Sequence, residues 1–187
     1  MNTPRARPTP TDEPGLRSIR ADDAADVLTA FASASDMARQ GGVTNLDTAA
    51  AYLATLLEGR HIVFGLTARD RVVGAVGVTV DEVNRNGWLW YWMHAGFRGR
   101  GWTTRAAATV ADWALTEGGL DRLELGHRVN NPASGAVARA AGFVPEGLER
   151  RKLLMDGDRF DVITYGRLVD DPWPTVCRLP LDQRFVG

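Results

Sequence analysis

Hydrophobic and polar positions alternate in several short runs of the chain, and elsewhere apolar residues recur at helical spacing. Alternation rich in β-branched or aromatic residues indicates strands, whereas apolar residues three or four positions apart indicate amphipathic helices. The first pattern predicts strands over residues 16–20, 61–67, 71–80, 88–93, 122–125, 143–152 and 159–167. The second predicts helices that begin at residue 22 or 23, at 47, at 102 and at 132. These elements predict an α/β fold with a mixed central sheet of about seven strands and flanking helices.

The order of the elements constrains the sheet. A tight turn at residues 69–70 and a polar connection at 81–85 make residues 61–93 an antiparallel meander. A helix separates the strands at 88–93 and 122–125, and such a crossover requires the two strands to be parallel. The last two strands form a hairpin around residues 156–158.

The junction at residues 98–104 carries the first candidate site. Gly99 and Gly101 let the backbone approach a ligand closely, at the start of the helix that begins with Trp102. The first turn of a helix has unpaired N–H groups and the positive end of the macrodipole, so it binds anions. Charge and hydroxyl donors are added by Arg98, Arg100, Thr103 and Thr104. The predicted ligand is a diphosphate.

Two common diphosphate motifs do not fit this junction. A Walker loop requires a lysine, and the single lysine of the chain is Lys152. A dinucleotide fingerprint requires a third glycine near the first strand, which Gly99-Arg100-Gly101 lacks in the middle of the chain. The junction therefore fits neither a Walker loop nor a dinucleotide-binding fingerprint.

The junction resembles motif A of the GNAT superfamily of N-acetyltransferases, Arg/Gln-x-x-Gly-x-Gly/Ala, with Thr103 at the last position as a departure. Asn131-Pro132-Ala133-Ser134 resembles motif B in the form found in the ribosomal-protein N-acetyltransferase (RimJ/RimL) branch. That branch commonly has Gly-Tyr-Trp-Leu before motif A, where this chain has Trp90-Tyr91-Trp92-Met93. The resemblance extends from about residue 16 to residue 167.

The resemblance implies a GNAT fold in which two parallel strands splay apart, with acetyl-CoA as the acetyl donor. Its pyrophosphate would lie on residues 98–104, and its pantetheine arm would contact the backbone near Trp92 and Met93. Asn131 would bond the pantetheine arm, and Ser134 would return a proton to the departing thiolate. A primary amine would attack the thioester directly, and no metal is required.

The acceptor side is less defined. In the family, the loop at residues 34–45 borders the acceptor pocket, so Asp36, Arg39 and Asn45 are candidate acceptor contacts. Some members use a glutamate as base at the position that Trp88 occupies here, and Glu82 is the nearest acidic alternative beside Asp81. Trp88 belongs to a stripe of three indoles on one face of its strand, which is typical of core packing and can also wall an acceptor pocket. For His94 and His127, a structural role is at least as good an interpretation.

Composition sets the remaining expectations. With 187 residues and 44% hydrophobic content, the chain suits one globular domain over residues 15–169. Residues 1–14 hold four of the nine prolines and are expected to form a flexible arm, and residues 170–187 an irregular tail that could fold back or reach another chain, as in a homodimer. A net charge of −1 gives no reason to expect nucleic acid or an anionic membrane as partner. The single cysteine, Cys177, and the lack of a long apolar run favour the cytoplasm.

Three functions remain open. The first is an acetyl-CoA-dependent N-acetyltransferase acting on a protein N-terminus or a small-molecule amine. The second uses a longer acyl donor such as succinyl-CoA, for which arginines such as Arg150 or Arg151 would face the acyl group. The third is a non-catalytic CoA-binding module.

Overall fold

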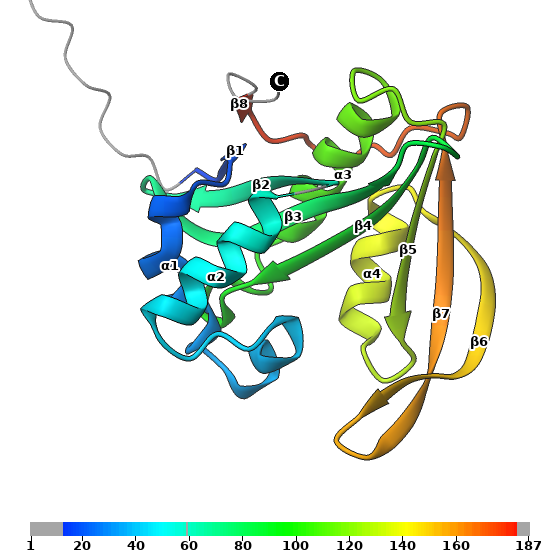
Figure 1. Ribbon diagram of the computed structural model, residues 1–187. Helices are drawn as coiled ribbons and strands as arrows, with labels where there is room; N and C mark the ends of the chain where they lie inside the picture. Colours follow the sequence, from blue (N-terminus) through cyan, green and yellow to red (C-terminus); the bar gives the residue numbers. More distant parts are fainter. Residues whose placement is uncertain (1–12, 59, 183–187) are drawn as a thin grey trace, which may run out of the picture.

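The computed structural model describes residues 13–58 and 60–182, so most of the expected arm at 1–14 and the last residues of the tail lie outside the described part. Within that part, eight strands form one sheet in the order β6-β7-β5-β4-β3-β2-β1-β8 (Figure 1). Their bounds are β1 Gly15–Ser18, β2 His61–Ala68, β3 Arg71–Asp81, β4 Asn86–Met93, β5 Arg122–Arg128, β6 Val144–Met155, β7 Asp158–Leu168 and β8 Leu181–Asp182. The pairs β4–β5 and β1–β8 are parallel and the others antiparallel, which confirms the predicted mixed sheet.

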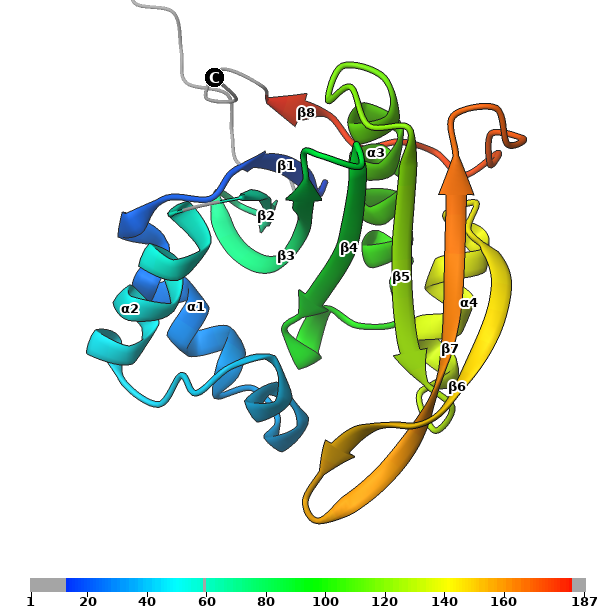
Figure 2. The ribbon, with the colours of Figure 1, turned by 45° about the vertical axis from the view of Figure 1, so that its right-hand side comes forward.

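In the described residues, α-helices cover both faces of the sheet (Figure 2). One face carries α1 (Ala24–Phe31) and α2 (Leu46–Leu57), and the other carries α3 (Trp102–Leu115) and α4 (Pro132–Ala140). Short 3-10 helices join them: η1 (Ala21–Asp23), η2 (Ser35–Gln40) and η3 (Ala95–Phe97). The domain therefore has two hydrophobic cores, one on each side of the sheet.

The aromatic strand β4 contributes to both cores. Trp92 and Trp90 pack with the residues of α1 and α2, while Leu89 and Met93 pack with those of α3. This is the alternation that the sequence predicted, because successive strand side chains point to opposite faces. Trp88, on the same face as the other two indoles, keeps 38% of its surface exposed.

The central parallel pair is short. β4 and β5 pair at Asn86↔Arg122, Gly87↔Leu123 and Trp88↔Glu124, and no further pairing between them occurs in the described residues. Beyond Trp88 the two strands diverge toward their C-terminal ends (Figure 2), while β5 stays paired with β7 along its whole length. The sheet thus has the predicted split between two parallel strands.

The tail is more ordered than predicted. Residues 170–180 contain no helix or strand, but the chain then adds β8 to the sheet beside β1. The N–H of Leu179 donates to Thr109 Oγ1 of α3 at 2.9 Å, and Leu16 N–H donates to the carbonyl of Pro180 at 2.9 Å. Arg178 of the tail and Arg167 of β7 both pair with Asp112 of α3. These contacts attach the tail to the domain.

Candidate active site

The loop before α3 has the backbone that the sequence predicted. Gly99 and Gly101 adopt left-handed conformations, with φ of +76° and +73°, and a Cβ at either would meet no protein atom within 4 Å. The backbone N–H groups of residues 99–104 make no hydrogen bond to any described residue. Unpaired donors at the positive end of a helix therefore face open space.

The arginine side chains of this loop bond to other protein groups and so fix the position of the loop. Arg98 Nε donates to the carbonyl of Met93 at 3.1 Å, and its guanidinium forms an ion pair with Asp36 of η2 at 2.9 Å. Arg100 donates to the carbonyl of Gly96 at 3.1 Å and stacks on Phe97 and Trp102, with its guanidinium carbon 5.0 and 5.4 Å from the ring centres. The two guanidinium groups keep positive charge near the loop. Because their hydrogen bonds go to protein atoms, the backbone amides are the donors that stay available for a ligand.

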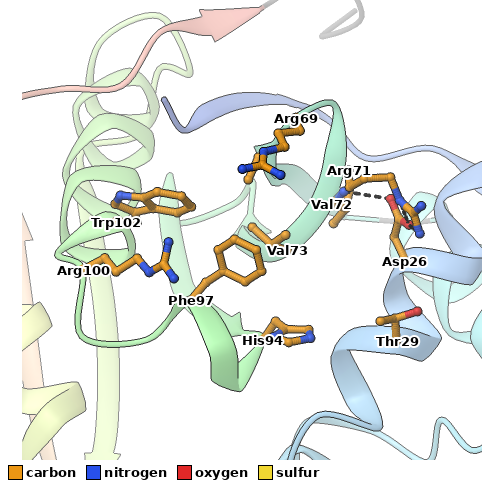
Figure 3. A pocket seen from close by; sticks show the side chains of 11 residues that line it. Asp26, Thr29, Arg69, Arg71, Val72, Val73, His94, Phe97, Arg100 and Trp102 are labelled. Atoms are coloured by element: carbon orange, nitrogen blue, oxygen red, sulfur yellow. Dashed lines mark hydrogen bonds and ion pairs between the residues drawn. The ribbon is translucent and has the colours of Figure 1, made fainter. Parts of the chain in front are cut away.

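Arg100 and Trp102 line a cavity of about 490 Å³ that we call the arginine-rich cavity (Figure 3). Phe97, Arg69 and Arg71 also line it, and Arg71 is committed to an ion pair with Asp26 of α1. The side chain of Trp102 therefore contributes to a cavity different from the one that Gly99 and Thr103 line. Thr104 lines none of the cavities described here.

The second cavity, the loop-side cavity, has a volume of about 260 Å³. It joins the loop before α3 to the diverging end of β4, the start of α4 and η2. Its lining residues are Asp36, Met37, Gln40, Tyr91, Trp92, Met93, Arg98, Gly99, Thr103, Asn131, Ala133, Ser134 and Val137. The structure thus brings together most of the predicted cofactor residues.

The third cavity, the hairpin-side cavity, has a volume of about 240 Å³ and lies between β4, β5 and the β6–β7 hairpin. Asp36, Arg39 and Trp88, three of the four predicted acceptor residues, line it. It shares five lining residues with the loop-side cavity: Asp36, Gln40, Tyr91, Asn131 and Ser134. Two ligands, one in each cavity, would therefore meet at Ser134.

The start of α4 positions Ser134. Asn131 Oδ1 accepts a hydrogen bond from the N–H of Ser134 at 3.3 Å, and Pro132 occupies the first helical position. Both are favourable helix-start chemistry, so the cap predicted for Asn131 is present. The cap also fixes Ser134 where the two cavities meet.

Tyr91 is a site residue that the sequence did not reveal. Its hydroxyl lies 2.8 Å from Ser134 Oγ and donates to the carbonyl of Ser134 at 3.0 Å. Because the phenol has one hydrogen, Ser134 Oγ is then the donor in the pair of hydroxyls. Burial raises the pKa of Tyr91 to about 12, which keeps the phenol protonated at neutral pH. The available signal was the alternation of β4, which directs Tyr91 to the face opposite the indoles.

Two candidates lie elsewhere. Asn45 caps α2, where its side chain accepts from the N–H of Thr48 at 2.9 Å, and it lines neither of the two cavities that meet at Ser134. Glu82 lies in the turn before β4 and lines a separate cavity with Arg85. Because Tyr91 lies near the far end of β4, the length of the strand separates Glu82 from Ser134, and the structure does not support Glu82 as the base.

The remaining titratable candidates are Asp36 and the two histidines. Among the residues that line the two cavities, Asp36 is the carboxylate, and it lines both. His94 Nδ1 accepts from the N–H of Gly96, which is a local turn contact. His127 is buried, 3.1 Å from the hydroxyl of Tyr165, and its other ring nitrogen is 2.8 Å from the carbonyl of Arg128. Structural roles account for the contacts of both histidines.

The described residues show no cluster of three or more metal-ligating His, Cys, Asp or Glu side chains. Across residues 13–58 and 60–182, none of the helices combines the length and apolar character that membrane crossing requires.

A mixed sheet that splits between two central parallel strands, with a glycine-containing loop and free amides at the start of the following helix, defines a GNAT-type fold. The sequence agrees: the family model described as Acetyltransferase (GNAT) domain matches residues 15–144, and the chain belongs to this family.

Two curated relatives match about half of the chain. "Putative ribosomal N-acetyltransferase YdaF" of Bacillus subtilis (strain 168) is 34% identical over 105 residues, which cover 56% of this chain and 57% of that protein. The ribosomal-protein-serine acetyltransferase of Escherichia coli (strain K12) is 26% identical over 108 residues, covering 57% and 60%. The chain thus spans less than two thirds of the length of these relatives.

Solved structures match the fold over a longer stretch. RimL, a ribosomal L7/L12 alpha-N-protein acetyltransferase in complex with coenzyme A, superposes with a TM-score of 0.78 at 20% identity, covering 86% of this chain and 96% of that one. The microcin C7 self immunity acetyltransferase MccE, in complex with acetyl-CoA and AMP, has a TM-score of 0.75 at 19% identity, covering 87% and 97%. At this identity the likeness establishes the fold.

Proposed function

We propose that the protein is an acetyl-CoA-dependent N-acetyltransferase that transfers an acetyl group to a primary amine. The observation that carries the proposal is the meeting of the loop-side and hairpin-side cavities at Ser134, in the split between β4 and β5. Such a site lets a donor and an acceptor approach one another from opposite sides.

The residues present fit coenzyme A. The unpaired amides of residues 99–104 suit a diphosphate, and the space before Gly99 and Gly101 is open to it. The loop-side cavity leads from Gly99 past Trp92 and Asn131 to Ser134, which suits a narrow arm. Bound acetyl-CoA would supply an activated acetyl group as a thioester.

The chain's own residues then divide the work. The amides of the loop hold the phosphates, and Asn131 keeps the start of α4 in place. Ser134 holds a proton at Oγ beside Tyr91, at the point where a thiol has to be protonated. Asp36, which lines both cavities, attracts the ammonium form of the acceptor and, in place of Glu82, serves as the base.

The acceptor is a protein N-terminus or a small-molecule amine. Two relatives are named for ribosomal acceptors, which supports a protein N-terminus, and Trp88 in place of a glutamate separates this chain from some members of that branch. Arg150 and Arg151, the arginines considered for a succinyl donor, line neither of the two cavities. Acetyl-CoA is therefore the proposed donor.

The test is release of free thiol from acetyl-CoA in the presence of a panel of primary amines and N-terminal peptides, with mass spectrometry of the products. We expect acceptor-dependent thiol release that Ser134→Ala reduces without weakening CoA binding. Tight CoA binding with no thiol release across the panel would identify a CoA-binding module instead.

A further inference from the structure

Two arginines line the hairpin-side cavity without a close anionic partner. Arg128 is the last residue of β5, and Arg39 lies in the last turn of η2. In the described part of the chain, the guanidinium of Arg128 makes no hydrogen bond or ion pair, and its carbon lies 5.7 Å from the centre of the Phe160 ring. Arg39 reaches Asp156 at 4.0 Å, the outer limit of an ion pair, and Asp156 is largely exposed.

The electrostatics of this pair are unfavourable without a further anion. Burial, and after it the positive charge of Arg39, lower the pKa of Arg128, although Asp36 and Asp156 act in the opposite direction. Asp36, the carboxylate that lines this cavity, is already shared with Arg98 at 2.9 Å. Two like charges that face one half-enclosed space favour an anion between them.

We infer that the acceptor is a primary amine that carries a carboxylate near its amino group, and that Arg39 and Arg128 bind this carboxylate in the hairpin-side cavity. The inference rests on the proposed function, since it names the substrate class of the same site. The amino group is directed toward Asp36 and Ser134, where the two cavities meet, and the carboxylate toward β5 and the hairpin. Guanidinium groups suit this role because their donors match the two oxygens of a carboxylate.

The arginines belong to the acceptor side. Neither lines the loop-side cavity, which Gly99 and Thr103 of the loop before α3 line. An acidic small molecule and an acidic peptide N-terminus present the same chemistry to them. The experiment therefore includes both.

The test compares matched acceptors and matched variants. The small-molecule arm uses L-aspartate against its diamide, and the peptide arm uses Ser-Asp-Glu-Phe against Ser-Asn-Gln-Phe. The variants are Arg128→Gln and Arg39→Gln, with Arg150→Gln as the control, because Arg150 is an exposed arginine of β6 that lines neither cavity. Calorimetric titration of L-aspartate and of the acidic peptide into the CoA-saturated protein gives a binding readout that does not depend on transfer.

We expect kcat/KM for the acidic member of at least one pair to exceed that for its neutral partner by about tenfold or more, the usual worth of a hydrogen bond to a charged group. Arg128→Gln should abolish most of this preference by lowering activity on the acidic acceptor, and it should weaken acceptor binding in the titration. Arg150→Gln should leave both unchanged. Which pair shows the effect distinguishes a small acidic amine from an acidic N-terminus.

The inference is overturned if the neutral acceptors are used equally well, or if the preference survives in the Arg39→Gln/Arg128→Gln double variant. It also fails if these variants change the use of succinyl-CoA relative to acetyl-CoA, since the arginines would then serve the donor. Arginine-dependent binding of the acidic ligand with no acetyl transfer to any amine would instead refute the proposed function and leave the carboxylate site standing.

Discussion

Gly101→Ala tests whether the amides before α3 bind a diphosphate. Gly101 has a φ of +73°, and a Cβ there would project into open space, where it meets no protein atom within 4 Å. The added methyl therefore clashes with no part of the protein, and it takes up open space within the loop whose N–H groups at residues 99–104 are unpaired.

The chain offers a matched control for this substitution. Gly119, after the other end of α3, has a φ of +67° and equally open surroundings. A left-handed backbone costs a residue with a Cβ roughly 1–2 kcal/mol, so both variants should lose about the same stability. For a chain of this length that corresponds to a melting temperature lower by about 2–8 °C in each.

CoA binding should separate the two variants. A hydrogen bond to a charged group is worth about 1.5–3 kcal/mol, so a methyl group that displaces the phosphate from one or more amides should weaken CoA binding by about tenfold to a hundredfold. Gly119→Ala should leave the dissociation constant unchanged. Calorimetric titration of CoA together with thermal unfolding measures both quantities, and equal CoA affinity in the two variants would refute the diphosphate site.

Two further predictions concern stability. Asp112→Ala should lower the free energy of unfolding, measured by urea titration, by about 3–5 kcal/mol, because it leaves the guanidinium of Arg167, which is 1% exposed, without its counter-ion. Arg85→Ala is the control: it breaks an exposed ion pair and should cost less than about 1 kcal/mol in the same measurement. Gly77→Ala should cost about 1–3 kcal/mol, because its Cβ would lie 2.3 Å from Cζ2 of Trp90 and would push the indole out of place. An unchanged near-ultraviolet circular dichroism spectrum in this variant would contradict that displacement.

The sequence predicted the elements well where local patterns decide. The strands of the meander, the turn at residues 69–70 and the start of α3 at Trp102 follow from alternation, turn residues and paired glycines. Asn45 carries a local signal for a further role: Asn three residues before Thr48 is a helix-capping arrangement, and the structure contains that cap. Strand β8 has two residues and depends on contacts of Leu179 and Pro180 with distant elements, so no pattern could reveal it.

The candidate site depends on contacts between residues far apart in the chain. Arg98 pairs with Asp36 across 62 positions, and Tyr91 reaches Ser134 across 43. Glu82 lies near the aromatic strand in sequence, yet a strand advances about 3.3 Å per residue, so the two ends of β4 are roughly 20 Å apart. The spacing of the two motifs predicted the positions of the loop and of the start of α4. Their partners Asp36 and Tyr91 lie far away in the sequence, so only the folded structure identifies them.

Tyr91→Phe tests whether the hydroxyl pair positions a proton at Ser134. The substitution keeps the ring and removes the hydroxyl that lies 2.8 Å from Ser134 Oγ. Losing one hydrogen-bond partner costs about 1–2 kcal/mol, so kcat should fall by roughly tenfold while KM for acetyl-CoA changes little. Tyr52→Phe is the matched control, because burial raises the pKa of Tyr52 also to about 12, its hydroxyl accepts from Trp92 Nε1 at 3.1 Å, and Tyr52 itself lines neither of the two cavities.

If Tyr91 acts through Ser134, adding Tyr91→Phe to Ser134→Ala should cause almost no further loss of kcat, because residues that act as a unit are not additive. If Tyr91 had only a structural role, Tyr91→Phe and Tyr52→Phe would lower stability alike, and the effects of Tyr91→Phe and Ser134→Ala on kcat would be independent of each other. Additive losses in Tyr91→Phe/Ser134→Ala, or an equal fall of kcat in Tyr52→Phe, would therefore show that the two hydroxyls do not share a proton path, and Ser134 would have to hold its proton unaided.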